Sequence, residues 1–295
     1  RGFKLIIVWS DANTVAAVEE MQHTNLTDLD PAQQAIQQAT STTVTMPSDG
    51  PVSTVIYDVN ISPQEALQNT VNELKNMDYN IVAVMPGAET GVLLADELCS
   101  ELQTRSNPLH LSFARRNKYA MGETVRKAGI RAVNQCKATK WEDIELFLSE
   151  WNPNPFAVVV KPIQSAGSDD VFKCINIQEV KTAFDKINGA INGLGVINEG
   201  VLVQEFLDGI EYVIDSVSRN GVHKTVALWE YDKRSVNGAN FVYFGMKLLD
   251  TDSELAQQLI NYSDSVLDAL GIMNGPGHME VIMCPHGGPC LVEVG

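Results

Sequence analysis

Two glutamates near the end of the sequence, Glu280 and Glu293, are its strongest candidates for chemistry. Each lies in a mainly apolar segment that is typical of a strand, and residues 285–289 between them (Pro-His-Gly-Gly-Pro) are typical of a turn. Folding this hairpin between His286 and Gly287 places the two glutamates directly opposite each other on one face. Cross-strand Cβ atoms lie about 5 Å apart, so the carboxylates repel each other. A divalent cation removes that repulsion, and two carboxylates with phosphate oxygens and water form a common Mg²⁺ site. On the hairpin alone, two solvated carboxylates at a sheet edge remain an equal alternative.

A buried strand that ends in a lysine is the second candidate. Three valines lead into Lys161, and a lysine at the end of an apolar strand is costly to bury without an anionic partner. Residues 164–170, which follow, are small and polar, and such loops bind phosphates through hydroxyl and backbone N–H groups. The Walker A order is absent. This pattern predicts a phosphate-binding flap, and an ordinary loop is the alternative.

Two further segments have side chains suited to binding. The strand expected at 201–207 is apolar on both faces, and Glu211 follows the turn after it. An apolar slot beside such a strand suits a purine ring, and a nearby carboxylate suits ribose hydroxyls; a plain core strand is the alternative. A long polar segment is expected at 231–240, and the aromatic and basic side chains lie at 229–234 and 241–245, with Gly238 between them. They are interpreted as a lid over a substrate or as a solvated surface loop.

Composition limits the classes of partner. The formal net charge of the 295 residues is −16, which argues against nucleic acid or an anionic membrane as the main partner. No apolar run reaches the roughly 18–20 residues of a membrane span. The sequence has five cysteines without a regular framework, which predicts free thiols. We therefore expect a soluble protein of a reducing compartment, either cytoplasm or an organelle stroma or matrix.

Three successive parts must position these residues. Residues 1–110 alternate strand and helix, which predicts a parallel sheet covered on both faces. In this part strands are expected at 4–9, 52–57 and 80–85, helices from about 13, at 63–77 and at 92–102, and a surface helix and loop at 32–45. In residues 111–198 we expect helices at 118–128, 141–151 and 177–187 and strands at 156–161 and 171–176. Residues 199–295 are expected to be mostly strands (201–207, 211–219, 222–230 and the glutamate hairpin) with one helix at 255–270.

The order of these motifs resembles the ATP-grasp superfamily. The motifs are a lysine on a helix at 117–121, the strand-end lysine with its Ser/Gly flap, Gln-Glu-Phe-Leu at 204–207, and the terminal glutamate pair. Residues 86–91 and 165–169 resemble the carboxylate–amine ligases of the L-amino-acid ligase type in particular. The resemblance implies an ATP-grasp fold, α/β and α+β, after an N-terminal Rossmann-like domain at 1–110. Residues 111–198 would be the small subdomain with the flap, and residues 199–295 the large subdomain with the Mg-binding hairpin.

The resemblance also implies roles for individual residues. Those that would bind ATP are Lys118 and Lys161 at the phosphates (Lys161 also near the adenine), Ser165, Ala166, Gly167 and Ser168 over the β- and γ-phosphates, Gln204 and the backbones of Glu205 and Leu207 at the adenine edge, and Glu211 at the ribose. Glu280 and Glu293 would hold Mg²⁺ or Mn²⁺ and, with Lys161, act in catalysis. Glu89 and His278 would line the substrate site, although a structural role suits His278 equally.

The implied activity is an ATP- and Mg-dependent carboxylate–amine ligase that acts through an acyl phosphate and releases ADP and phosphate. A carboxylase or nucleotide-biosynthesis enzyme and an inactive nucleotide-binding subunit are the alternatives, and a homodimer is left open. The family has an asparagine two residues after the second glutamate, where this sequence has Gly295. Its later arginine, Gly-rich turn and C-terminal subdomain are expected to be missing from the sequence given.

Overall fold

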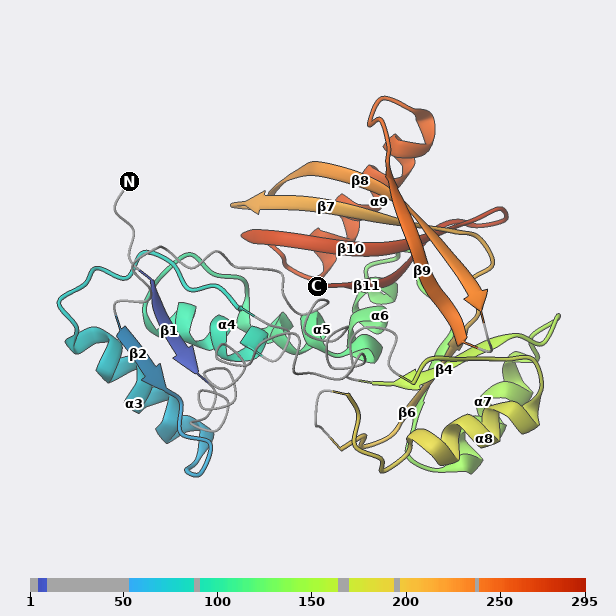
Figure 1. Cartoon of the computed structure of the whole chain (residues 1–295), viewed down its shortest axis with the longest axis horizontal. Helices are drawn as coiled ribbons and strands as arrows, with labels where there is room; N and C mark the ends of the chain where they lie inside the picture. The colour runs from blue at the N-terminus through green and yellow to red at the C-terminus, as the bar shows by residue number, and fades with distance from the viewer. Residues whose placement is uncertain (1–4, 10–52, 88–90, 164–169, 194–196, 237–238) are drawn as a thin grey trace, which may run out of the picture. The chain divides into compact units, whose positions relative to one another are not determined.

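The computed structural model describes residues 5–9, 53–87, 91–163, 170–193, 197–236 and 239–295 (Figure 1). The chain divides into two compact units. One unit comprises residues 1–84 and 97–104, and the other comprises residues 85–96 and 105–295. The predicted domain boundaries near residues 110 and 198 stay a prediction. None of the helices in the described ranges has both the length and the apolar character needed to cross a membrane.

The first unit contains a two-stranded parallel sheet, with β1 (Ile6–Trp9) paired to β2 (Ser53–Ile56). The helix α3 (Pro63–Asn76) follows β2. It begins at this point because the Ser62 hydroxyl accepts the Glu65 N–H and a proline occupies the first turn. Both strands and the helix agree with the prediction to within one or two residues. The helix expected from about residue 13 and the segment 32–45 lie outside the described residues.

The third strand predicted for this unit is wrong. Residues 80–85 have no strand structure, and the side chains of Val82 and Met85 are 55% and 75% exposed. A short apolar run does not specify a strand by itself, because a strand also needs a neighbour that accepts its backbone hydrogen bonds. The helix expected after it is present as α4 (Val92–Glu101).

The second unit contains a four-stranded antiparallel sheet in the order β3-β6-β4-β5. Its strands are β3 (Gln135–Ala138), β4 (Val158–Pro162), β5 (Phe172–Cys174) and β6 (Val201–Glu205). The helices α7 (Trp141–Trp151) and α8 (Ile177–Ile187) pack against it through a buried cluster that includes Ile144, Val160, Phe184 and Val203 (Figure 1). The short strand β3 was not predicted, because four residues of mixed polarity carry too weak a pattern.

A five-stranded antiparallel sheet in the same unit has the order β11-β10-β7-β8-β9. Its strands are β7 (Ile210–Arg219), β8 (Val222–Val236), β9 (Ala239–Leu248), β10 (Gly275–Cys284) and β11 (Gly288–Val294). The helices α6 (Lys118–Lys127) and α9 (Glu254–Ala269) contribute to the buried cluster on this sheet, which includes Val125, Ile214, Leu259 and Met279. A short 3-10 turn, η3 (Leu109–Leu111), and α5 (Ser112–Arg116) precede α6.

The prediction of a polar loop at 231–240 is wrong for residues 231–236 and 239–240, which belong to the strands β8 and β9. Strand β8 continues to Val236, and β9 pairs with it, for example Tyr231 with Met246. Polar and aromatic side chains do not prevent a strand when a neighbouring strand pairs with the backbone. The tip residues 237 and 238 lie outside the described residues.

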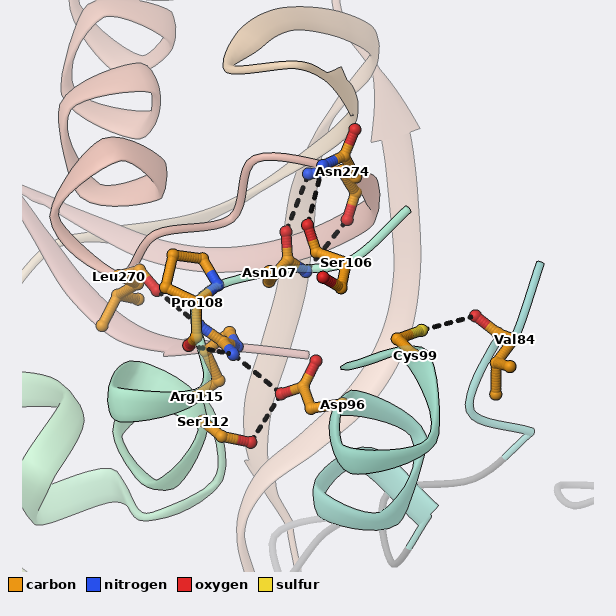
Figure 2. A network of polar contacts seen from close by, with 10 residues as sticks. All are labelled: Val84, Asp96, Cys99, Ser106, Asn107, Pro108, Ser112, Arg115, Leu270 and Asn274. Carbon is orange, nitrogen blue, oxygen red and sulfur yellow. Dashed lines mark hydrogen bonds and ion pairs between the residues drawn. The ribbon is translucent and has the colours of Figure 1, made fainter. Parts of the chain in front are cut away.

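A buried polar network within the second unit includes Asp96 of α4. Figure 2 shows Asp96 between Arg115 and Ser112, with its Oδ2 2.7 Å from Arg115 Nη2 and 2.5 Å from Ser112 Oγ. The guanidinium also donates to the carbonyls of Pro108 and Leu270. The two charges of the ion pair are almost fully buried, with exposed side-chain fractions of 6% and 11%. This network joins α4, α5 and the end of α9.

Gly209 lies where the chain passes from β6 to β7, tightly against β10. A Cβ atom at this position would lie 2.2 Å from the Met283 carbonyl oxygen. We predict that Gly209→Ala lowers the free energy of unfolding by about 1–3 kcal/mol, because backbone must move to relieve the clash. The measurement is the midpoint of urea unfolding. Gly245→Ala is the control, since no atom lies within 4 Å of its Cβ position. Equal midpoints for the two variants would contradict the prediction.

Candidate active site

The structure places Glu280 and Glu293 opposite each other on β10 and β11, as the sequence predicts. The turn differs from the prediction: Cys284 pairs with Gly288, so the hairpin is centred on His286. A β-bulge after Glu280 then shifts the register by one residue and restores the glutamate pairing. The pair therefore depends on the bulge as well as on the turn.

Two lysines from different elements lie near this pair. Lys118, the first residue of α6, has its Nζ 2.5 Å from Glu293 Oε2. The side chain of Asn117 caps this helix by accepting the Ala120 N–H, which fixes where the helix begins. Lys161 lies in β4 of the four-stranded sheet and is 6% exposed. The second unit thus brings together four of the charged residues that the sequence singled out.

These charges shift one another's ionisation. Burial and the neighbouring Lys118 lower the pKa of Lys161 to about 8, and the nearby glutamates only partly offset them. Burial opposes ionisation of Glu293, but Lys118 and Lys161 outweigh it and lower the pKa of this carboxyl. Several charges of both signs therefore interact strongly in this site, and burial and neighbouring charges both shift their pKa values.

A third carboxylate, Glu211 of β7, belongs to the same cluster. It forms an ion pair with Lys233 of β8, and both side chains are nearly buried. Burial raises the pKa of Glu211, Lys233 opposes this rise, and Glu280 adds to it. The sequence predicts Glu211 at a ribose, and that role stays a prediction.

Two tyrosines from the paired strands β8 and β9, which we call the β8–β9 arm, lie next to the glutamate pair. The Tyr231 and Tyr243 rings meet edge to face with their centroids 4.9 Å apart, and the Tyr243 hydroxyl donates to Glu280 Oε1 at 3.3 Å. Burial and Glu280 raise the pKa of Tyr243, so this hydroxyl stays protonated at neutral pH. The arm is thus in contact with the glutamate pair.

His278 lies two residues before Glu280 and points to the same face of β10, as predicted. Its Nδ1 lies 2.8 Å from Asp215 Oδ1, and the Trp229 indole donates to the other oxygen of that carboxylate at 2.8 Å. The Nε2 atom is 3.5 Å from the Tyr231 hydroxyl. The ring is therefore held in one orientation by partners on β7 and β8.

The segment predicted to bind adenine has internal partners. The Gln204 amide donates to Gln135 Oε1 at 2.9 Å, and Gln135 in turn donates to the Tyr119 carbonyl at 2.9 Å. This chain of bonds holds β6 to α6 through β3. The predicted contacts of Gln204, Glu205 and Leu207 with adenine stay a prediction.

Some predicted residues cannot be compared with the structure. Ser165, Ala166, Gly167 and Ser168 of the flap, and Glu89, lie outside the described residues. Sequence reasoning missed Asp215, Gln135 and Arg131. Asp215 is one of many acidic residues in the sequence, and only the pairing of β10 with β7 brings it to His278.

The carboxylate oxygens of the glutamate pair suit a hard divalent cation that takes its other ligands from phosphate and water. Among the described residues, no group of three or more His, Cys, Asp or Glu side chains is arranged to hold a metal ion. The facing Glu280 and Glu293 supply two carboxylates, and Mg²⁺ accepts such a pair when phosphate oxygens and water complete its octahedron. The residues present therefore fit Mg²⁺ or Mn²⁺ bound together with a nucleotide.

Comparison with known proteins tests the predicted fold. Residues 154–295 match the ATP-grasp domain family. The protein has the ATP-grasp fold, since the L-amino acid ligase from Bacillus licheniformis aligns with 100% of this chain and 67% of its own (TM-score 0.67, 18% identity). The D-alanine–D-alanine ligase from Bacillus anthracis complexed with ATP aligns with 100% of this chain and 86% of its own (TM-score 0.63, 14% identity). The predicted fold is thus confirmed, and residues 154–295 match the family that the sequence motifs resemble.

One relative has a higher sequence identity to this chain than these two structures do. Dapdiamide A synthase of Enterobacter agglomerans is 37% identical over 219 residues, which is 74% of this chain and 50% of that protein. The chain thus spans about half the length of this relative. The similarity lies in the carboxylate–amine ligase branch, as the sequence motifs indicated.

Proposed function

We propose that this chain is the ATP-binding part of an ATP-dependent carboxylate–amine ligase that forms a C–N bond and releases ADP and phosphate. The observation that carries the proposal is the facing pair Glu280 and Glu293, with Lys118 and Lys161 beside it on an ATP-grasp fold. The names of the similar proteins, an L-amino acid ligase and a dapdiamide synthase, support the same reaction class.

In this proposal the lysines bind the phosphates of ATP. Lys118 and Lys161 approach the glutamate pair from α6 and β4, so phosphates between these elements would meet two positive charges. The flap at 165–168 would cover the β- and γ-phosphates through backbone N–H groups. Gln204 and the backbones of Glu205 and Leu207 would bind the adenine edge, and Glu211 would bind the ribose.

Glu280 and Glu293 would hold Mg²⁺ or Mn²⁺. When bound, the ion neutralises charge on the transferred phosphoryl group. Until then, the Lys118 ammonium balances the charge of Glu293. Tyr243 orients Glu280 through its hydroxyl, which keeps one carboxylate oxygen fixed in place.

The chemistry proceeds in two displacements. A substrate carboxylate oxygen attacks the γ-phosphorus, and the bond to the ADP oxygen breaks, which gives an acyl phosphate. An amine nitrogen then attacks the acyl carbon, phosphate leaves with the C–O bond electrons, and the nitrogen loses a proton. The residues of the chain act by positioning and by charge neutralisation, for which lysines held next to the phosphates are effective. Glu89 and His278 would line the site of the carboxylate and amine substrates.

Release of ADP and phosphate over a panel of carboxylates and amines tests this function. We expect release that needs a carboxylate, and an amide product that needs an amine. ADP release without any amine-dependent product would overturn the ligase assignment, and dependence on bicarbonate would favour a carboxylase. Binding of ATP without turnover in the full-length protein would favour an inactive nucleotide-binding subunit.

The lowered pKa of Lys161 predicts proton uptake when ATP binds. Its pKa is about 8 in the free protein, so above this pH the amine is largely neutral. The phosphates of ATP favour the ammonium form and raise that pKa, so at about pH 9 binding should take up a sizeable fraction of one proton, and below pH 7 almost none. Calorimetric titration in two buffers of different ionisation enthalpy measures the number of protons taken up per ATP bound.

Lys161→Met is the matched variant for this prediction. It removes the titrating amine, so the proton uptake at alkaline pH should disappear while weaker ATP binding remains measurable. Uptake at pH 9 that persists unchanged in Lys161→Met would assign the proton to another group.

A further inference from the structure

Arg131 joins two parts of the site that are far apart in the sequence. Its Nη2 atom lies 3.3 Å from Glu205 Oε1 at the end of β6 and 4.0 Å from Cys284 Sγ at the end of β10. We call residues 204–209 the hinge segment and residues 284–288 the hairpin tip. The guanidinium thus lies between the segment predicted to bind adenine and the tip of the hairpin that carries the glutamate pair.

The backbone at Arg131 is fixed to the same hairpin. The Tyr262 hydroxyl of α9 donates to the Arg131 carbonyl at 2.7 Å and accepts the Leu291 N–H of β11 at 2.8 Å. At the hairpin tip, a Cβ on Gly287 would lie only 3.0 Å from Arg131 Nε, so the turn packs directly on the guanidinium. Arg131 therefore has little freedom to move relative to the hairpin.

Glu205 receives hydrogen bonds at both carboxylate oxygens. While Oε1 is paired with Arg131, Oε2 accepts the Asn134 N–H at 3.1 Å. The Glu205 N–H donates to the Asn134 carbonyl at 2.8 Å. The end of β6 is thus held by the chain between Arg131 and β3, and a charge-assisted bond of this kind is stronger than a neutral one.

Apolar packing supports the same contact. Leu207 of the hinge segment is 8% exposed and belongs to a small buried cluster with Val133, Cys284 and Cys290. Two residues later, Gly209 passes so close to Met283 that no side chain fits. The hinge segment therefore contacts the hairpin at Leu207 and Gly209, and Arg131 adds a charged link to the hairpin tip through Glu205.

We propose that Arg131 is a positioning residue for the adenine end of ATP. By holding Glu205 against the hairpin tip, it sets the hinge backbone at a fixed distance from the glutamate pair and the lysines. ATP then binds the adenine and phosphate sites together, and no binding free energy is lost in ordering the hinge segment. This inference rests on the proposed function, since it assumes that the hinge binds adenine and that the pair of glutamates binds the phosphate-bound metal.

The test compares two ligands that both have three linked phosphates, of which only ATP has an adenine base. Calorimetric titrations with Mg²⁺ use ATP and inorganic tripolyphosphate on the wild type and on Arg131→Gln. We expect Arg131→Gln to weaken ATP binding about tenfold, the size expected for losing a hydrogen bond to a charged group. Tripolyphosphate binding should change less than about twofold, because the side chain of Arg131 contacts Glu205 and the hairpin tip, which are not the residues proposed to bind phosphate.

Two further variants separate positioning from general stability. Arg131→Lys keeps the charge but cannot reach Glu205 and the hairpin tip together, so ATP affinity should lie between wild type and Arg131→Gln. Glu205→Gln should reproduce the selective loss for ATP, and the double variant Arg131→Gln/Glu205→Gln should lose little more than either single variant. Lys181→Gln, which removes a charge from an exposed pair on α8, is the control and should bind both probes as the wild type does.

Each outcome decides between the two proposals. Equal loss of ATP and tripolyphosphate affinity, or no loss of either, would overturn the role of Arg131 while leaving the proposed function intact. A wild type that binds neither probe would instead overturn the proposed function. If Arg131→Gln does not fold by circular dichroism, Arg131→Lys and Glu205→Gln carry the test.

Discussion

Replacing Glu280 or Glu293 by glutamine should reduce metal-dependent ADP formation by about 10³-fold, the size of several kcal/mol of lost transition-state stabilisation. The amide keeps the shape of the side chain but removes the negative charge that a divalent cation needs. In Glu280→Gln the repulsion between the facing carboxylates also disappears, so this variant should unfold at the same or a higher urea concentration than the wild type. Steady-state ADP release measures the loss of activity, and urea unfolding measures the change in stability.

The two glutamine variants should differ in stability although both should lose activity to the same extent. Glu293 Oε2 lies 2.5 Å from Lys118 Nζ, so Glu293→Gln removes the negative charge that faces this mostly buried ammonium and should lower stability. Glu145→Gln, an exposed change on α7, is the control and should alter neither property. Full ADP formation by Glu280→Gln at ordinary Mg²⁺ concentration would exclude this pair as the metal site.

Replacing Asp96 by alanine should lower the free energy of unfolding by about 3–5 kcal/mol, because it leaves the buried Arg115 guanidinium without its counter-ion. Ser112 also loses its acceptor, at 2.5 Å in the structure. The network lies in the second unit, which contains Trp141, Trp151 and Trp229. Urea unfolding followed by tryptophan fluorescence is therefore the measurement.

An exposed ion pair provides the comparison for Asp96. Asp185→Asn removes a similar charge from the pair with Lys181 on the surface of α8, and it should cost less than about 0.5 kcal/mol. The double variant Asp96→Ala/Arg115→Met should recover part of the loss, because no unpaired charge then remains buried. A change below about 1 kcal/mol in Asp96→Ala would mean that water reaches the guanidinium.

Several elements could be predicted from the sequence because their signals are local. The helix α8 has an asparagine cap that accepts the Glu179 N–H, and α7 is followed by a Pro- and Asn-rich stretch, so both helices have the predicted bounds. The sequence also predicted that the two glutamates face each other, but the turn is centred on His286, and the pairing is restored by a bulge that was not predicted. The motifs then indicated the ATP-grasp fold through their order along the chain.

Other features depended on contacts between distant segments. The sequence did not indicate that residues 80–85 lack a strand or that β8 continues to Val236, because strand pairing depends on a partner elsewhere in the chain. For the same reason Arg131 and Asp215 could not be distinguished from other charged residues.

The sequence by itself determined the kinds of side chain in this protein's site: facing carboxylates, a strand-end lysine and a lysine at a helix start. These follow from short-range periodicity, caps and turns. Only the tertiary structure decided which charges meet, with Lys118 against Glu293, Lys233 against Glu211 and Arg131 against Glu205. The physical reason is that the energy of a charge depends on distance and on water exclusion, and both are set by how separate elements pack.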